Sequence, residues 1–188
     1  MPRLLFASDI HGSASAMRRL VEAYRVEKAS RLILLGDLLY HGPRNDLPDE
    51  YAPKQVIEML NELKDDILVA LRGNCDAEVD QMVLNFPMMA DYAPLFLDDL
   101  GGRVVYLTHG HVYGADNLPP LKPGDVLMQG HTHVPFMGKR NGTMVLNPGS
   151  VALPKGGSVP SYMTYENEVF TLKALDGKIQ EELNLRGF

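Results

Sequence analysis

Two stretches decide the fold: RLLFASDIHG, residues 3–12, and RLILLGDLLY, residues 31–40. Each begins with a short apolar run that stops abruptly at polar residues, as a buried strand does. Between the two stretches, apolar residues recur at the spacing i, i+3, i+4 and i+7, which predicts an amphipathic helix through Met17, Leu20, Val21 and Tyr24. Strand, helix and strand in this order predict a βαβ unit with parallel strands and a right-handed crossover.

The same pattern continues to residue 71. A second helix is expected to begin near Pro53, a residue suited to the first helical turn, with Asp49 and Glu50 just before it. Its buried face is expected to contain Val56, Ile57, Leu60 and Leu63. Residues 67–71 form a third apolar run, so the chain starts as βαβαβ.

The second half of the chain has a different pattern. Short strands are expected at residues 95–100, 103–108, 125–129, 134–139, 143–146, 161–166, 169–174 and 178–183. Turn signals separate several of them, namely Gly101-Gly102, Asn141-Gly142 and Asp176-Gly177. We expect mainly antiparallel pairing here, and an α/β protein of two sheets packed face to face with helices outside. Residues 148–160, rich in proline and glycine, are expected to form a surface loop.

Composition narrows the classes of protein further. A chain of 188 residues is long enough for one domain, which we place at residues 1–188. A single cysteine excludes an intrachain disulfide, and residues 1–12 contain too short an apolar run for a signal peptide, so we expect a cytoplasmic protein. No run approaches the ~20 apolar residues that span a bilayer. The net charge of −6 argues against nucleic-acid binding through a broad basic face.

An apolar segment, FPMMADYAPLF, occupies residues 86–96. It is a candidate surface for homo-oligomer formation, because exposed apolar patches often bind a partner. The alternative is that it folds over the core of its own chain.

Candidate site residues stand where apolar runs end. They are Asp9 and His11, Asp37, Asn74 with Cys75 and Asp76, His109 with His111, and His131 with His133. The carboxyl ends of parallel strands lie at one edge of a sheet, where ligand sites gather. Two side chains at i and i+2 on an extended segment face the same way, so Asp-x-His and His-x-His pairs can each present two ligand atoms. A lone aspartate there is usually a helix cap or turn former, but capping does not explain the histidines.

This ligand set favours a catalytic metal site. Nitrogen and oxygen ligands disfavour a closed structural zinc site and suit Mn²⁺, Fe²⁺ or Zn²⁺. The set is larger than one ion requires, and two ions that share a carboxylate would use it fully. A pair of ions roughly 3.5–4 Å apart can clamp a phosphoryl group for in-line displacement.

Five blocks in order resemble the calcineurin-like metallophosphoesterases: Asp9-x-His11, Gly36-Asp37, Gly73-Asn74, His109 and Gly130-His131-x-His133. The segment LNPGS at residues 146–150 and the short chain resemble the small bacterial and archaeal phosphodiesterase branch. The resemblance implies a two-sheet αββα sandwich and an enzyme that hydrolyses a small phosphodiester. It also implies two divalent metal ions, with Mn²⁺ favoured over Fe²⁺ and Zn²⁺.

The resemblance also implies a role for each residue. Asp9, His11 and His133 would hold one ion, Asn74, His109 and His131 the other, and Asp37 would bridge both. A hydroxide between the two ions would attack phosphorus. Asp76 would orient its neighbour at position 75. Residues expected to contact substrate are Tyr40, His41, Arg44, Asn45 and Arg72, while His41 and His111 are individually also typical of surface residues.

One residue departs from the family pattern. Family members have Gly-Asn-His followed by an acid, and that histidine handles the leaving-group proton or orients the phosphate; this chain has Cys75. The thiol is a proton donor, a thiolate in contact with metal, or an inert filler, and the sequence leaves these alternatives open. We expect a preference for good leaving groups, such as those of aryl or nucleoside-phosphate diesters, because general acid catalysis contributes ~10²–10⁴-fold.

Two other functions fit the sequence less well. A dinucleotide-binding oxidoreductase is disfavoured, because the first turn, SDIHGSASAM, lacks the spaced glycines of that motif. A scaffold similar to the retromer subunit of this fold shares the segments HGH, GHTH and NPGS. Retention of Asp9, His11, Asp37 and Asn74 favours an enzyme over this scaffold.

Overall fold

Strand β1 (Leu4–Ala7) lies at the centre of the molecule and is buried on both faces. In the computed structural model, which describes residues 3–186, Leu5 and Ala7 face the helices while Leu4 and Phe6 face the second sheet. This alternation follows from the two-residue side-chain period of a strand. A strand buried on both faces needs the continuous apolar run that residues 4–7 provide.

The βαβαβ start is confirmed. Helix α1 (Ala14–Val26) follows β1, and the Ser13 side chain caps it by accepting a hydrogen bond from the Ala16 N–H. β2 (Arg31–Leu34), α2 (Pro53–Glu62) and β3 (Ile67–Ala70) come next, and β2 pairs parallel with both β1 and β3. Pro53 begins α2 as predicted. The apolar stripes of both helices pack against β1 and β2.

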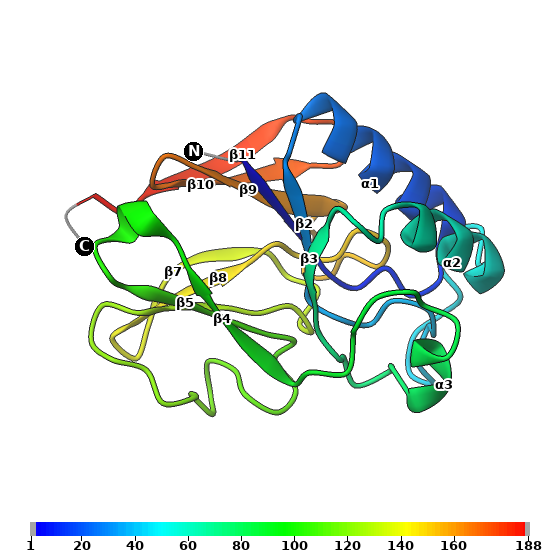
Figure 1. Ribbon diagram of the computed structural model, residues 1–188, viewed down its shortest axis with the longest axis horizontal. Coiled ribbons are helices and arrows are strands. Elements are labelled where there is room, and N and C mark those ends of the chain that lie inside the picture. Colours follow the sequence, from blue (N-terminus) through cyan, green and yellow to red (C-terminus); the bar gives the residue numbers. More distant parts are fainter. Residues whose placement is uncertain (1–2, 187–188) are drawn as a thin grey trace.

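Two sheets pack face to face, which confirms the sandwich (Figure 1). The six-stranded sheet has the order β11-β10-β9-β1-β2-β3, completed by β9 (Ser161–Glu166), β10 (Val169–Ala174) and β11 (Ile179–Asn184). The five-stranded sheet has the order β4-β5-β6-β8-β7, formed by β4 (Tyr92–Phe96), β5 (Val104–Thr108), β6 (Val126–Met128), β7 (Phe136–Arg140) and β8 (Thr143–Asn147). Most pairs after β3 are antiparallel, but β6 pairs parallel with both neighbours.

The outer layers of the sandwich differ from each other. Helices α1 and α2 cover the six-stranded sheet, whereas within residues 3–186 a loop covers the outer face of the five-stranded sheet. Ala115 and Leu121 of this loop pack on Leu127 and Val145. Short helix α3 (Glu78–Gln81), which the sequence did not indicate, follows the third strand. In the described part of the chain, no helix is long and apolar enough to cross a membrane.

One strand is displaced from its predicted position. The strand expected at residues 95–100 lies at Tyr92–Phe96, because Asp98–Leu100 form a 3₁₀ turn that leads to β5. Pro94 is tolerated because β4 is an edge strand. Within the segment 86–96, Phe86 and Met88 fold into the core of their own chain, while β4 leaves alternate side chains exposed.

Candidate metal centre

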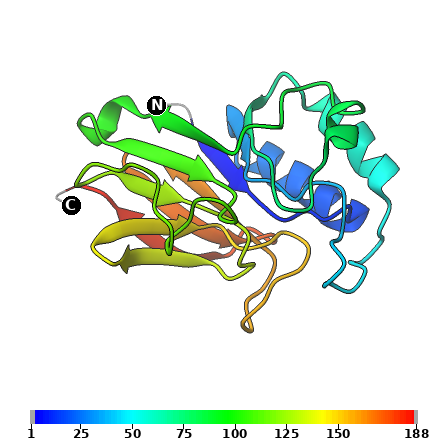
Figure 2. The same cartoon turned by 90° about the horizontal axis from the view of Figure 1, so that it is seen from below.

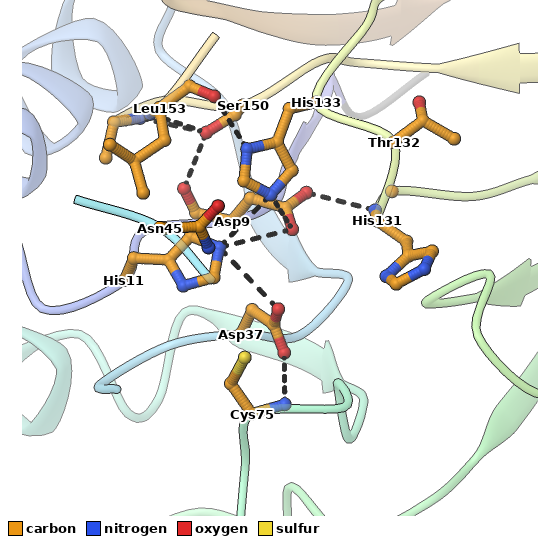
Figure 3. A network of polar contacts seen from close by, with 12 residues as sticks. Asp9, His11, Asp37, Asn45, Cys75, His131, Thr132, His133, Ser150 and Leu153 are labelled. Atoms are coloured by element: carbon orange, nitrogen blue, oxygen red, sulfur yellow. Dashed lines mark hydrogen bonds and ion pairs between the residues drawn. The ribbon is translucent and has the colours of Figure 1, made fainter. Parts of the chain in front are cut away.

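Five chain segments that follow strands converge on one site. Asp9 and His11 follow β1, Asp37 follows β2, and Asn74 follows β3. From the second sheet, His109 follows β5 and the pair His131 and His133 follows β6. Figure 3 shows Asp9, His11, Asp37 and His133 pointing toward one another, with Cys75 beside Asp37 and His131 at the side. The carboxyl ends of parallel strands in both sheets therefore form the site, as the general rule for α/β sheets predicts.

The backbone conformation of the site differs from the extended segments that the sequence predicts. Asp9, His11, Asp37, His131 and His133 have φ angles of 59°, 49°, 54°, 66° and 60°. These values lie in the left-handed region, which costs an ordinary residue of order 1–3 kcal/mol. The sequence predicts that the two side chains of each pair face the same way because they alternate along an extended strand. The pairs Asp9/His11 and His131/His133 do not converge in this way. They lie in tight turns beyond the strands, and packing holds those turns in place.

Asp9, His11 and His133 form the first group. The Asp9 Oδ1 atom lies 3.3 Å from His133 Nε2 and 3.7 Å from His11 Nε2, and the two Nε2 atoms are 3.2 Å apart. The other ring nitrogen of each histidine, Nδ1, contacts a main-chain carbonyl oxygen: His11 Nδ1 lies 2.8 Å from that of Tyr40, and His133 Nδ1 lies 2.6 Å from that of Leu153. A carbonyl can only accept, so each Nδ1 carries the proton and each Nε2 lone pair faces the site.

Asp37, Asn74 and His109 form the second group. His109 Nε2 lies 3.2 Å from Asn74 Oδ1 and 3.5 Å from Asp37 Oδ2, while His109 Nδ1 donates to the Leu35 carbonyl at 2.7 Å. Asp37 Oδ2 is also 3.6 Å from His11 Nε2, so it lies between the two groups. The His131 ring lies 5.1 Å from that of His109, and its main-chain N–H donates to Asp9.

These groups have the chemistry of a cation site. Asp9 is fully buried, and its Oδ1 atom has no hydrogen-bond partner among the described residues. Burial opposes ionisation of Asp9 and Asp37, but their histidine neighbours outweigh it and lower the pKa of both carboxyl groups. Burial likewise opposes protonation of His109, yet the nearby carboxylates raise its pKa to about 9. Ionised carboxylates and imidazole Nε2 atoms aimed at one space fit divalent metal ions, which would take the place of the proton on His109.

Cys75 lies at the edge of this space. Its Sγ atom comes close enough to His11 and Asp37 for the three to hold one ion. Its main-chain N–H donates to Asp37 Oδ1 at 2.8 Å, and the Asn74 amide lies 3.2 Å from the sulfur. Burial, followed by the negative charge of Asp37, raises the pKa of the thiol to about 12. A cation bound to these ligands would act in the opposite direction.

Asp76 contacts a different part of the site than the sequence had predicted. Its carboxylate accepts hydrogen bonds from the main-chain N–H groups of Gly73 at 2.7 Å, Asp37 at 2.7 Å and Leu38 at 2.9 Å. It thus joins the turn after β2 to the turn after β3, rather than reaching the Cys75 side chain. Burial raises the pKa of Asp76 to about 6, although the N–H donors favour its ionised form. Gly73 is required here, since an added Cβ would lie 2.0 Å from Asp37 Oδ1.

A cavity of about 390 Å³ opens beside the ligands. Its lining includes predicted ligands and two predicted substrate contacts, Arg44 and Asn45. The other lining residues are Gly42, Pro43, Cys75, Thr132 and Lys155. Lys155 and Thr132 were missed, because a lone lysine in a glycine-rich loop and a threonine between two histidines carry no distinctive signal.

The structure places the other predicted substrate contacts outside the lining of this cavity. The ring of His41 packs between those of Tyr40 and Tyr51, at centroid distances of 4.7 and 5.2 Å. Tyr40 serves the site through its carbonyl oxygen instead. Arg72 instead forms an ion pair with Asp91 at 2.7 Å. His111 packs edge-on against His109, 5.3 Å between centroids.

Comparison with known proteins agrees with this geometry. Residues 3–168 match the model of the calcineurin-like phosphoesterase superfamily domain. The chain is 48% identical to the phosphodiesterase YfcE of Escherichia coli K12 over 176 residues, which cover 94% of each protein.

Two solved structures extend the comparison. The structure of the E. coli phosphoesterase YfcE superposes with a TM-score of 0.91 at 46% identity, covering 97% of this chain and 99% of the other. Vacuolar Protein Sorting 29 from Cryptosporidium parvum has the same fold at a TM-score of 0.60 and 20% identity, over 97% of this chain and 98% of the other. The protein is therefore a member of the calcineurin-like phosphoesterase superfamily.

Proposed function

We propose that this protein is a phosphodiesterase that depends on two divalent metal ions, with Mn²⁺ the favoured metal, and that a hydroxide between the ions attacks phosphorus. The position of Asp37 carries the proposal, because its Oδ2 atom lies 3.6 Å from His11 and 3.5 Å from His109, between two groups of ligands. A carboxylate in this position suits a ligand shared by two ions. The 48% identity to a phosphodiesterase over nearly the whole chain supports the same reaction.

Each ligand has a role in this proposal. Asp9, His11 and His133 hold one ion, Asn74, His109 and His131 hold the other, and Asp37 contacts both. When bound, the ions supply Lewis acidity, which generates hydroxide from water at neutral pH and offsets the charge on the phosphoryl oxygens. The carbonyls of Tyr40, Leu35 and Leu153 fix three imidazole rings so that Nε2 faces the site.

The cavity indicates where a small phosphodiester binds. It is continuous with Asp37, Asn74, His131 and His133, and its volume suits a ligand of nucleotide size. Asn45 and Thr132 offer neutral hydrogen-bonding groups along its lining.

Cys75 lines this cavity, at the position where the family pattern leads us to expect a histidine. A thiol has a reference pKa of about 8.5, against about 6.5 for imidazole, so it is the weaker proton donor at neutral pH. We therefore expect the enzyme to favour diesters whose leaving group departs without a proton. Aryl and nucleoside-phosphate diesters have this property.

A scaffold of the same fold is the alternative function. The likeness to Vacuolar Protein Sorting 29 shows the fold alone, at 20% identity. The complete ligand set favours an enzyme: five of its seven residues have left-handed φ angles, and such strain accumulates at functional sites.

Metal analysis together with a diesterase assay tests this proposal. Purified protein should contain about two divalent ions per chain and should hydrolyse bis(4-nitrophenyl) phosphate. Dialysis against EDTA should remove this activity, and Mn²⁺ should restore it. Protein that binds no metal and shows no metal-dependent turnover would favour the scaffold function.

A further inference from the structure

Two cationic side chains line the cavity without partners. Arg44 comes from the turn between β2 and α2, and Lys155 comes from the loop between β8 and β9. Within residues 3–186, neither the guanidinium nor the ammonium group forms a hydrogen bond or an ion pair. Their charges are therefore available to a ligand in the cavity.

Hydrogen bonds to the main chain hold the two loops that carry Arg44 and Lys155 beside the metal site. Asn45 N–H donates to the Gly42 carbonyl at 3.3 Å, and the Asn45 amide donates to the His41 carbonyl at 2.8 Å, which closes the turn around Arg44. Gly42 in this turn packs so closely on Cys75 that an added Cβ would lie 2.8 Å from its sulfur. Lys155 N–H donates to the carbonyl of the predicted ligand His133 at 3.0 Å.

The two loops project from the same side of the molecule. Figure 2 shows the segment around residue 44 in light blue and the segment around residue 155 in orange, both extending downward. The cavity lies where residues of both loops meet Asn74 and Cys75. Each loop thus contributes one cationic residue to the lining of the same cavity.

The charge of the cavity contrasts with that of the chain. The protein has 24 acidic and 18 basic residues, yet among the residues that the structure describes, Asp37, a predicted metal ligand, is the only acid lining the cavity. In the proposed reaction, two divalent ions held by two aspartates retain two positive charges. One hydroxide and one monoanionic diester balance these charges, so Arg44 and Lys155 remain for further negative charge on the substrate.

We propose that the natural substrate is a phosphodiester that carries a second phosphate group, and that Arg44 and Lys155 bind this second phosphate. The proposal rests on the proposed phosphodiesterase function and names the substrate class of that site. A planar guanidinium matches phosphate with two parallel hydrogen bonds, and an ammonium adds a point charge. A bisphosphorylated nucleoside has the size and charge that this cavity accommodates.

Two chromogenic substrates that differ by one phosphate test this assignment. The first is the 4-nitrophenyl ester of thymidine 5′-phosphate, and the second is the same ester with an added 3′-phosphate. Both release 4-nitrophenolate from the same diester, so the leaving group is constant. The wild-type kcat/KM should be about tenfold or more higher for the second ester, as one charge-assisted hydrogen bond provides.

Variants of Arg44 and Lys155 test whether these two residues cause the higher kcat/KM for the ester with the added phosphate. Lys155→Gln and Arg44→Gln should each lower this ratio of kcat/KM values several-fold, mainly through KM, and the double variant should bring it near one. Lys64→Gln and Arg25→Gln are matched controls, because both residues are exposed and lie at the opposite ends of the parallel strands. If the cations bind the reacting phosphate instead, both esters lose activity equally and the ratio stays constant, which overturns the proposal.

A binding measurement separates this inference from the proposed reaction. By calorimetry with Mn²⁺ present, thymidine 3′,5′-bisphosphate should bind about tenfold more tightly than thymidine 5′-phosphate, and the double variant should remove the difference. This outcome without diester hydrolysis would retain the phosphate site and reject the proposed reaction. Equal affinities of the two nucleotides in the wild type would reject the second-phosphate site, even in an active enzyme.

Discussion

The carboxylate of Asp76 lies 2.7 Å from the main-chain nitrogen of Asp37, and it joins the turns that follow two neighbouring strands. The same carboxylate oxygen also accepts a hydrogen bond from Gly73, just before the predicted ligand Asn74. One buried side chain thus sets the distance between two parts of the metal site. Its importance follows from geometry, because an acceptor for three N–H groups cannot move without moving both turns.

We predict that Asp76→Asn weakens metal binding about 10–100-fold, as loss of a supporting contact around metal ligands typically does. The amide offers one oxygen where the carboxylate offers two, and its NH₂ group would face a main-chain N–H. Calorimetric titration with Mn²⁺ and the metal dependence of diester hydrolysis both measure the change. Asp65→Asn, at an exposed residue outside the site, is the control. An unchanged Mn²⁺ affinity would show that the two turns keep their positions without Asp76.

Asp37→Asn and His131→Ala should each abolish hydrolysis of bis(4-nitrophenyl) phosphate, because each removes a proposed metal ligand. Asp37→Asn should also lower the amount of metal bound per chain, since Asp37 lies between both groups of ligands. Metal content by mass spectrometry and turnover at saturating Mn²⁺ provide the measurements. Near wild-type turnover of either variant, with metal fully restored, would contradict the model of a bridged pair of ions.

Cys75→His should raise the hydrolysis of alkyl and sugar phosphate diesters by about 10²-fold or more, the lower end of the general-acid contribution. The gain on nitrophenyl diesters should be much smaller, because nitrophenolate leaves without a proton. Cys75 lines the cavity, so an imidazole at this position can extend into open space. Cys75→Ala is the control for the loss of sulfur. Equal gains across the leaving-group series would refute the assigned role of position 75.

A second polar cluster should control the stability of the fold. Glu27 ends α1 and accepts hydrogen bonds from Tyr162 at 2.8 Å, Lys173 at 2.7 Å and Arg3 at 3.0 Å. Burial raises its pKa, but these partners outweigh burial and lower it below the usual value of 4.5. Glu27→Gln should therefore lower the free energy of unfolding at pH 7 by about 2 kcal/mol, the usual size for hydrogen bonds to a charged group.

The same cluster gives a pH dependence with a defined sign. A carboxyl group whose pKa is lower in the folded state stabilises the protein above its unfolded pKa, and this contribution is lost as pH falls. The stability difference between wild type and Glu27→Gln should thus be full at pH 7 and should shrink below about pH 4.5. Urea unfolding of both proteins across this range measures it, with Glu22→Gln on the exposed face of α1 as the control. A difference that stays constant with pH would show that packing, not charge, makes Glu27 stabilising.

Much of the fold could be predicted from local patterns. The stripe through Met17, Leu20 and Tyr24 defines α1, and the apolar runs at residues 4–7 and 31–34 define two neighbouring parallel strands. Asn141-Gly142 marks the turn between β7 and β8 as expected. These features depend on side-chain periodicity and turn chemistry, which a few adjacent residues determine. The position of β4 does not follow from such local patterns, because the 3₁₀ turn after β4 changes where its pairing with β5 ends.

By itself, the sequence determined which residues gather at the site, because polar side chains that end parallel strands must meet at one edge. Only the tertiary structure decided how they are held and which neighbours face the cavity. It places Arg44 and Lys155 on the cavity and packs Tyr40 and His41 elsewhere. It also directs Asp76 to the Asp37 turn. Loop direction and left-handed turns arise from contacts between residues far apart in the chain, and no local pattern records those contacts.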